Sequence, residues 1–198
     1  MNKPTAGKKI PRGDQRRNLI LKSLHGCIIK NGYAKTTLAD IAEAADMYPS
    51  HLLYYFKGKD AILEFYFQKV ANQILERIDS FRSQTAQQQI ESITELFFSG
   101  TRITKSEIGF MLECFGVAVN DKVLRQEKSQ YDEKIKLYLS DLFSIKPQET
   151  FPSSRDSAEV AYALLVGLRS AVYFDEKMEL EDARRLFHGS VLLMAGLV

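Results

Sequence analysis

Residues 35–60 decide the fold, and they run KTTLADIAEAADMYPSHLLYYFKGKD. Two short helical patterns lie side by side here, separated by a tight break at Asp46-Met47-Tyr48. Isolated helices shorter than about 12–15 residues are marginal in water, so a chain that keeps two of them usually needs their shape. A helix-turn-helix unit has that need, because its second helix projects into a DNA groove.

Local signals predict where both short helices begin. Thr37 is a good N-cap residue, and Asp40 follows three positions later as in a capping box. Pro49 stands where the second helix should have its first residue, a position that favours proline. These signals predict one helix starting after Thr37 and another starting at Pro49.

The second short helix is expected to have an anchored face and a free face. Leu52 and Phe56 recur four residues apart and can anchor it to an inward face of the first helix. That inward face consists of Leu38, Ile41, Ala42 and Ala45. Pro49, Ser50, His51, Leu53 and Tyr55 remain off the anchored face. Tyr54 lies between the two faces and is predicted to be packed, because aromatic side chains tend to be buried.

The flanking sequence predicts an all-α chain. Residues 1–13 mix Pro, Gly and Lys without a period and are expected to form a flexible basic arm. A helix is predicted from Asp14 until Asn31-Gly32 stops it, and another from Lys59 to about Phe81. Further helical periods cover 86–100, 104–119, 120–144, 154–174 and 179–197, and no segment alternates with period 2. About nine helices are expected.

Composition narrows the function. Residues 1–60 carry eleven Lys/Arg against five Asp/Glu, whereas the whole chain has a net charge of only +2. A basic front favours polyanion binding by that part alone. The chain has two cysteines without C-x-x-C spacing, which favours a reducing compartment. It shows neither a long apolar run nor a signal sequence, so we expect a cytoplasmic protein that does not span a membrane. His25, His51 and His188 form no catalytic motif, so we expect no enzyme, metal or cofactor.

The central stretch resembles a known family. The pattern Thr37-Leu38-x-Asp40-Ile41-Ala42-x-x-Ala45, followed by Leu52-x-Tyr54-Tyr55-Phe56-x-x-Lys59, is similar to the DNA-binding domain of tetracycline-repressor (TetR) family regulators. The detailed similarity covers about residues 14–66. It implies a three-helix helix-turn-helix DNA-binding domain at 14–58. It also implies a regulatory domain at 59–198 that binds a small-molecule effector and forms a homodimer through its last two helices.

The resemblance also implies DNA contacts at Thr37, Pro49, Ser50, His51, Leu53, Tyr55 and Lys59. Thr37 and Lys59 would meet phosphates at helix starts, where free N–H groups favour anions. Tyr55 would touch the backbone, and the other four would face the major groove, where Ser50 and His51 can hydrogen-bond base edges.

Three residues depart from the family pattern. Asp46 replaces a usual Gly at the end of the first short helix, and Asp tolerates the left-handed backbone less well. Tyr48 occupies the usual Ser/Thr N-cap position, so a cap hydrogen bond is expected to be missing. Ala39 replaces a frequent Arg, which removes one possible guanine contact. The operator therefore cannot be transferred from a relative.

The back half offers two interpretations. Its large side chains either fill a helical core or line a mostly apolar pocket, and the resemblance favours the pocket. The candidate ligand-binding residues are Phe97, Phe98, Arg102, Phe110, Met111, Glu113, Phe115, Tyr138 and Tyr162. Near the C-terminus, two helical patterns are apolar on more than one face, so they form either deep core or part of a dimer bundle, and the resemblance favours the dimer. They comprise Ala158, Ala161, Tyr162, Leu165, Leu168 and Val172, then Leu186, Val191, Leu193, Met194 and Leu197.

Two functions are thus open. The first is a transcriptional repressor that binds a palindromic operator in double-stranded DNA and is released by a small, apolar ligand. The second is an all-α small-molecule-binding or partner-docking protein without specific DNA binding, whose basic front is only a solvated surface. Specific binding to duplex DNA separates the two.

Overall fold

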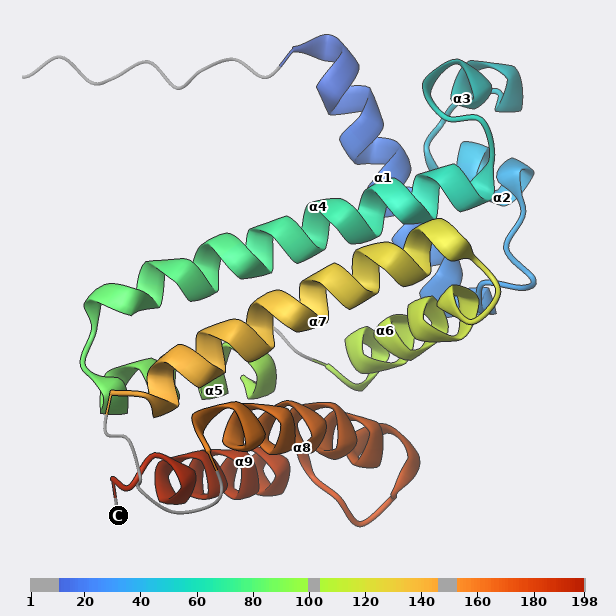
Figure 1. Ribbon diagram of the computed structural model, residues 1–198. Coiled ribbons are helices and arrows are strands. Elements are labelled where there is room, and N and C mark those ends of the chain that lie inside the picture. Colours follow the sequence, from blue (N-terminus) through green and yellow to red (C-terminus); the bar gives the residue numbers. More distant parts are fainter. Residues whose placement is uncertain (1–10, 100–103, 146–152, 198) are drawn as a thin grey trace, which may run out of the picture. The chain divides into compact units, whose positions relative to one another are not determined.

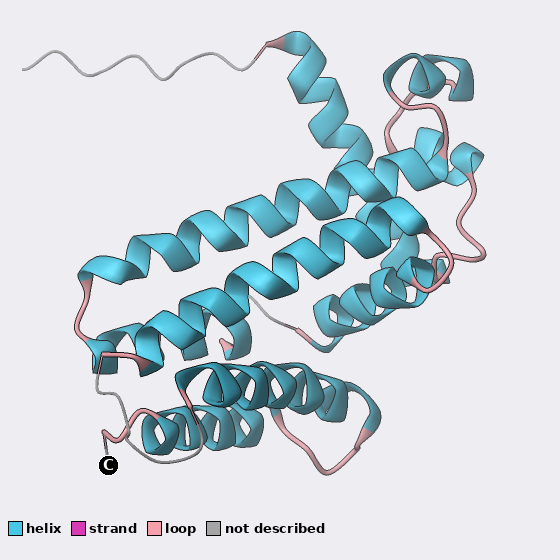
Figure 2. Ribbon diagram, viewed as in Figure 1, coloured by secondary structure: helices cyan, strands magenta, loops and turns pink. Residues whose placement is uncertain are grey.

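A computed structural model of the chain describes residues 11–99, 104–145 and 153–197. Within these ranges the regular elements are helices joined by loops, and no strand is present (Figure 2). The elements are α1 (Arg12–Asn31), α2 (Leu38–Ala44), α3 (Pro49–Tyr55), α4 (Lys59–Asp79), the short 3-10 helix η1 (Ser80–Ser83), α5 (Ala86–Phe98), α6 (Lys105–Ala118), α7 (Lys122–Phe143), α8 (Ser154–Phe174) and α9 (Leu180–Met194). The all-α prediction is confirmed.

Helix boundaries follow local backbone signals. Gly32 ends α1 with a positive φ of 76°, as its position after Asn31 predicted. The last helix ends at Met194 instead of the predicted 197. The reason is a second left-handed glycine, Gly196 with φ 63°, which lets the Leu197 N–H donate to the Leu192 carbonyl. The first helix begins two residues earlier than predicted, because α1 starts at Arg12 and not at Asp14.

The chain divides into two compact units between Tyr66 and Phe67. In the first unit α1 packs on α2 and α2 on α3, and the first residues of α4 complete the core (Figure 1). That core contains Ile20, Leu24, Ile41, Leu52 and Ile62, all fully buried. The predicted functional division at residues 58 and 59 falls at the start of α4, whereas the packing units divide at Tyr66.

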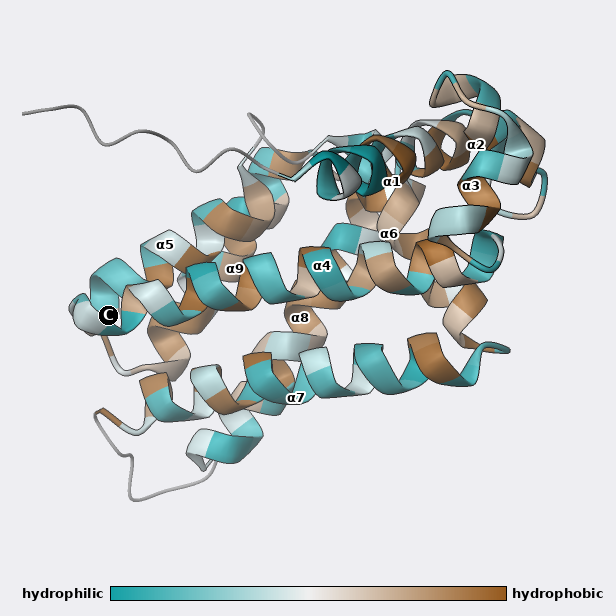
Figure 3. Ribbon diagram, turned by 90° about the horizontal axis from the view of Figure 1, so that it is seen from above, coloured by the Kyte–Doolittle hydropathy of each residue, from teal (hydrophilic) through white to brown (hydrophobic). Residues whose placement is uncertain are grey.

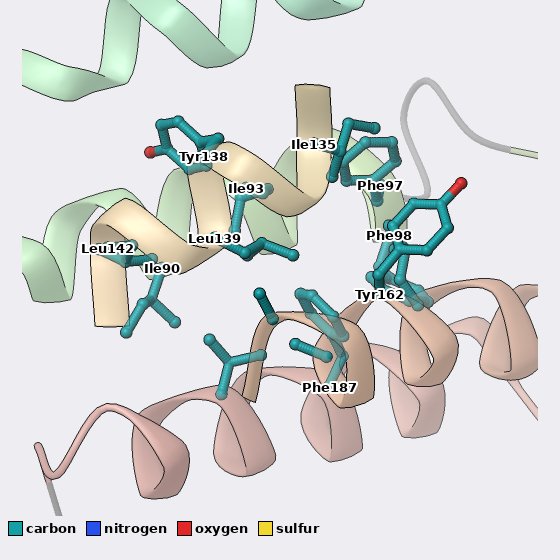
Figure 4. Close-up of a cluster of buried hydrophobic side chains, with 14 of the residues drawn as sticks. Ile90, Ile93, Phe97, Phe98, Ile135, Tyr138, Leu139, Leu142, Tyr162 and Phe187 are labelled. Atoms are coloured by element: carbon teal, nitrogen blue, oxygen red, sulfur yellow. The ribbon is translucent and has the colours of Figure 1, made fainter. Parts of the chain in front are cut away.

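The second unit is a helical bundle around one apolar cluster. Packing joins α7 to α8, α5 to α9, α8 to α9, and α6 to both α7 and α8. Figure 4 shows Ile90 and Ile93 of α5 with Leu139 and Leu142 of α7 and Phe187 of α9 in this cluster. In Figure 3, α7 carries both hydrophobic and hydrophilic residues along its length, as expected of a helix with one buried face.

The apolar face that the sequence offered for a dimer on α8 lies in the core of the same chain. Its members Ala158, Ala161, Tyr162, Leu165, Leu168 and Val172 are all buried. Exposed apolar side chains lie elsewhere on this helix, at Val160 and Phe174. When a helix is apolar on two faces, its sequence alone does not show which face is buried within its own chain.

Every helix in the described ranges is too short or too polar to cross a membrane.

Candidate nucleic-acid interface

The start of α2 is held by a reciprocal capping box. The Thr37 hydroxyl accepts the Asp40 backbone N–H at 3.1 Å, and the Asp40 carboxylate accepts the Thr37 N–H at 2.8 Å. Hydrogen bonds from the Thr37 side chain and backbone lower the pKa of the Asp40 carboxyl below its ordinary value. Thr37 itself is exposed. The predicted cap is confirmed, and it sets the direction in which α2 leaves the preceding loop.

A tight turn joins α2 to α3. Asp46 takes the left-handed backbone conformation, with φ 51°, at the position where the family pattern usually has Gly. The Met47 N–H reaches back to the Ala42 carbonyl and the Asp46 N–H to the Glu43 carbonyl, each at 3.0 Å, as in a Schellman motif. Asp adopts this conformation at a modest cost, so the turn survives the replacement of Gly.

Pro49 is the first residue of α3, as predicted, and its N-cap residue Tyr48 makes no side-chain cap hydrogen bond. The Tyr48 carbonyl instead accepts the N–H groups of His51 at 2.9 Å and Leu52 at 3.2 Å. A proline has no N–H to satisfy, which reduces the number of donors that a cap must serve. The helix therefore begins on backbone geometry alone.

One side of α3 is anchored and the other faces outward. Leu52 is fully buried and Phe56 is nearly so, with the Phe56 ring packed edge-on against Phe65 of α4 at 5.6 Å. Pro49, Ser50, His51 and Leu53 are exposed, as the DNA-facing prediction requires, and Tyr55 is half-buried. The residues that hold the helix and those available to a partner thus lie on different sides.

Tyr54 was predicted to be packed, and this was wrong. Its side chain is 85% exposed and contacts Tyr55 edge-on at 5.3 Å. Two helical positions separate it from Leu52, or roughly 200° around the helix axis at 3.6 residues per turn. The buried position of Leu52 therefore turns Tyr54 outward, and its helical spacing was the signal that could have found it.

A groove of about 710 Å³ opens beside α3 in the first unit. It is lined by Arg16, Glu43, Asp46, Met47, Tyr48, His51, Tyr54 and Tyr55. Within it the rings of Tyr48 and His51 pack edge-on at 5.8 Å. Arg16 supplies a cation, and Glu43 and Asp46 supply carboxylates that would repel phosphates. The groove thus has one cation against two carboxylates, and its other polar side chains are Tyr48, His51, Tyr54 and Tyr55. This lining suits hydrogen bonding to base edges more than bulk attraction to a polyanion.

Lys59 at the start of α4 contacts the loop after α1. Its Nζ donates to the backbone carbonyls of Tyr33 and Thr36, both at 2.8 Å, and lies 4.1 Å from the centre of the Tyr33 ring. The Tyr33 hydroxyl in turn donates to Asp60. Two of the three ammonium N–H groups are thus used inside the protein, which leaves one for the predicted phosphate contact. Lys59 therefore also stabilises the loop after α1, a role that the sequence did not predict.

The candidate ligand-binding residues of the second unit are spread over different environments. Phe97, Phe98, Tyr138 and Tyr162 are buried in the core cluster (Figure 4), and Met111 packs against its edge. Phe110 is buried, Phe115 is half-buried and Glu113 is exposed. Arg102 lies outside the described residues.

Two of these aromatic residues have partners of their own within the core cluster. Phe98 packs on Phe187 with ring centres 5.3 Å apart. The Tyr138 hydroxyl donates to Gln89 Oε1 at 2.7 Å, and burial raises the pKa of Tyr138 to about 12. Both contacts suit a role in the packing of α5 against α7 and α9.

The fold and the first unit define an all-α protein with an N-terminal helix-turn-helix DNA-binding domain. Residues 20–65 match the family model described as bacterial regulatory proteins of the tetR family. This match places a TetR-type DNA-binding domain in the first unit of the chain. No curated protein matches the chain by sequence.

Solved structures share the fold at low sequence identity. A protein of Pseudomonas aeruginosa PAO1, assigned as a transcriptional regulator, aligns with TM-score 0.77 and 13% identity over 94% of this chain and 93% of that chain. A TetR-family regulator from Rhodococcus sp. aligns with TM-score 0.72 and 19% identity over 92% and 99%. A transcriptional regulator from Saccharomonospora viridis, solved in complex with choline, aligns with TM-score 0.75 and 16% identity over 89% and 95%.

Proposed function

We propose that this regulator is a ligand-responsive repressor that binds a palindromic operator as a homodimer. The exposed face of α3 carries the proposal: Ser50, His51 and Tyr54 point away from the protein while Leu52 holds the helix from the other side. A rigidly held helix with hydrogen-bonding side chains on its outer face suits direct contact with base edges in a major groove. Thr37, Pro49, Leu53, Tyr55 and Lys59 complete the proposed contact set.

The dimer proposal rests on apolar surface that the chain leaves uncovered. Val160 and Phe174 on α8 are 56% and 70% exposed, and Leu193 on α9 is 68% exposed. The two helices pack against each other within the chain (Figure 1). Pairing these faces with a second copy about a twofold axis would bury them and form a four-helix bundle. A twofold dimer would also present two copies of α3 to half-sites about 34–36 Å apart.

An effector would act through the second unit. Support for a small-molecule site comes from the aromatic content of this unit and from the choline complex of the Saccharomonospora viridis regulator, which shares the fold. A ligand releases the repressor only if it binds the DNA-incompetent conformation better than the DNA-bound one. We propose an effector with a largely apolar body.

Selection of genomic fragments by the purified chain tests the proposal. Fragments recovered in the presence of excess competitor DNA should share a palindrome whose half-sites lie about one helical turn apart. The genes beside those sites would then supply candidate effectors for release assays. Recovery of fragments without a common sequence would instead favour the alternative of an all-α binding protein without specific DNA contacts.

A further inference from the structure

One arginine is buried inside the second unit. Arg169 of α8 is 8% exposed, and its Nε–H has no hydrogen-bond partner among the described residues. The guanidinium carbon lies 5.8 Å from the centre of the Phe97 ring of α5. Tyr131 of α7 and Tyr162 of α8 are close enough to act on the guanidinium electrostatically. An arginine is almost never buried without a partner, so this residue calls for an explanation.

The nearby carboxylates do not supply that partner. Asp132 accepts the hydroxyl of Tyr162 and the ammonium of Lys128, the latter at 2.5 Å. Glu107 acts on the guanidinium more weakly than either tyrosine does. Asp132 is thus committed to other donors, and no carboxylate of the described residues accepts the Nε–H.

Burial lowers the pKa of the Arg169 guanidinium, but arginine stays protonated in proteins. A buried cation with an unsatisfied N–H is costly, because the group has lost its water without gaining an acceptor. An anion that entered the site would recover this cost, and the planar guanidinium fork matches a carboxylate in particular. A buried arginine whose Nε–H lacks an acceptor therefore favours an acidic ligand over a neutral or cationic one.

We propose that Arg169 anchors the acidic group of the effector, and that the effector is an organic carboxylate with an apolar body. The inference rests on the proposed effector function and adds its chemical class. Phe97 and Tyr162 lie at the same end of the core cluster and offer apolar ring faces for the body of the ligand (Figure 4).

Calorimetric titration of the full chain without DNA tests this assignment. The probes are hexanoate, octanoate, decanoate and benzoate, each beside the amide of the same skeleton, together with inorganic phosphate. At least one carboxylate should bind about tenfold or more tightly than its amide, since hydrogen bonds to charged groups are worth that factor or more. Phosphate at the same concentrations should bind more weakly, because it lacks an apolar body.

Variants assign the preference to one side chain. Arg169→Gln should weaken binding of the preferred carboxylate roughly ten- to hundredfold and leave the amide unchanged. Arg169→Lys keeps the charge without the fork and should fall between. Arg155→Gln removes an exposed arginine from the same helix and should behave as wild type.

Clear results would overturn the inference. Equal affinities for every carboxylate and its amide in the wild type would do so, and this comparison needs no variant to fold. Unchanged carboxylate affinity in a folded Arg169→Gln protein would also do so. Because the titration contains no DNA, a failure of operator binding or release would leave this result standing and would count against the proposed function instead.

Discussion

The ammonium Nζ of Lys59 lies 2.8 Å from the backbone carbonyl oxygen of Tyr33 and 4.1 Å from the centre of its ring. The two residues are 26 positions apart, and the contact ties the start of α4 to the loop between α1 and α2. The same ammonium donates a second hydrogen bond, to the Thr36 carbonyl. The Lys59 ammonium therefore stabilises the helix-turn-helix unit from the start of α4, the helix that follows it.

Replacing this cation should destabilise the first unit. Lys59→Ala removes two charge-assisted hydrogen bonds to carbonyls, and about 1–2 kcal/mol of unfolding free energy should be lost because the site is only half-buried. DNA affinity should fall by the same factor on all sequences. Denaturant unfolding and fluorescence anisotropy measure both. Lys57→Ala, which removes an exposed charge nearby, should leave stability unchanged; equal stability of the two variants would refute the structural role of Lys59.

Tyr54 should contribute to DNA binding and not to folding. Tyr54→Ala removes a side chain that is 85% exposed, so the melting temperature should hardly change. Affinity for the operator should fall about tenfold, as expected for the loss of one hydrogen bond and its ring contact. Tyr54→Phe separates the hydroxyl from the ring. A large fall in melting temperature with unaltered DNA affinity would show that Tyr54 is a packing residue after all.

The capping box should make α2 sensitive to acid. The pKa of Asp40 is lowered in the folded protein, so its contribution to stability is present above its ordinary pKa and is lost as pH falls through the folded-state value, below about pH 4. Thr37→Ala removes the hydrogen bond that lowers the pKa most. Carboxyl NMR titration should then find the Asp40 pKa closer to its ordinary value, while the Thr37 backbone N–H still holds it partly down. An unaltered pKa in that variant would mean that another group stabilises the carboxylate.

The dimer should depend on the exposed apolar side chains of α8 and α9. Leu193→Asp places a charge on a 68% exposed position, so the chain should fold but sediment as a monomer. Leu137→Asp is the matched control, since Leu137 is 61% exposed on α7 and lies outside the proposed interface. Analytical ultracentrifugation distinguishes the two. A Leu193→Asp protein that remained dimeric would move the interface to another surface.

Local features of this chain could be predicted well from sequence. The Thr37–Asp40 box, the Pro49 start and the range of α8 all follow from interactions between residues a few positions apart. The left-handed backbone at Asp46 could likewise be anticipated, because the first residue of the break has to reverse the chain.

Features set by tertiary packing could not be predicted in the same way. The contact of Lys59 with Tyr33 spans 26 residues and leaves no local pattern. The apolar face of α8 that the sequence offered for a dimer is buried within the chain, because an apolar face has the same composition in a core and in an interface. The Nε–H of Arg169 lacks an acceptor because of which side chains surround it, and the nearby Asp132 carboxylate already accepts from Tyr162 and Lys128. The exposure of Tyr54, in contrast, could have been predicted from its helical spacing to Leu52. The prediction relied instead on the general tendency of aromatic side chains to be buried.

Discrimination between DNA sequences by α3 is tested most directly by comparing affinities. Wild-type protein should bind its best selected palindrome at least about a thousandfold more tightly than a random duplex at physiological salt. His51→Ala should reduce that preference by about 1–3 kcal/mol on the best site while affinity for random duplex stays the same. Equal affinity of the wild type for the selected palindrome and for random duplex would contradict sequence discrimination by α3.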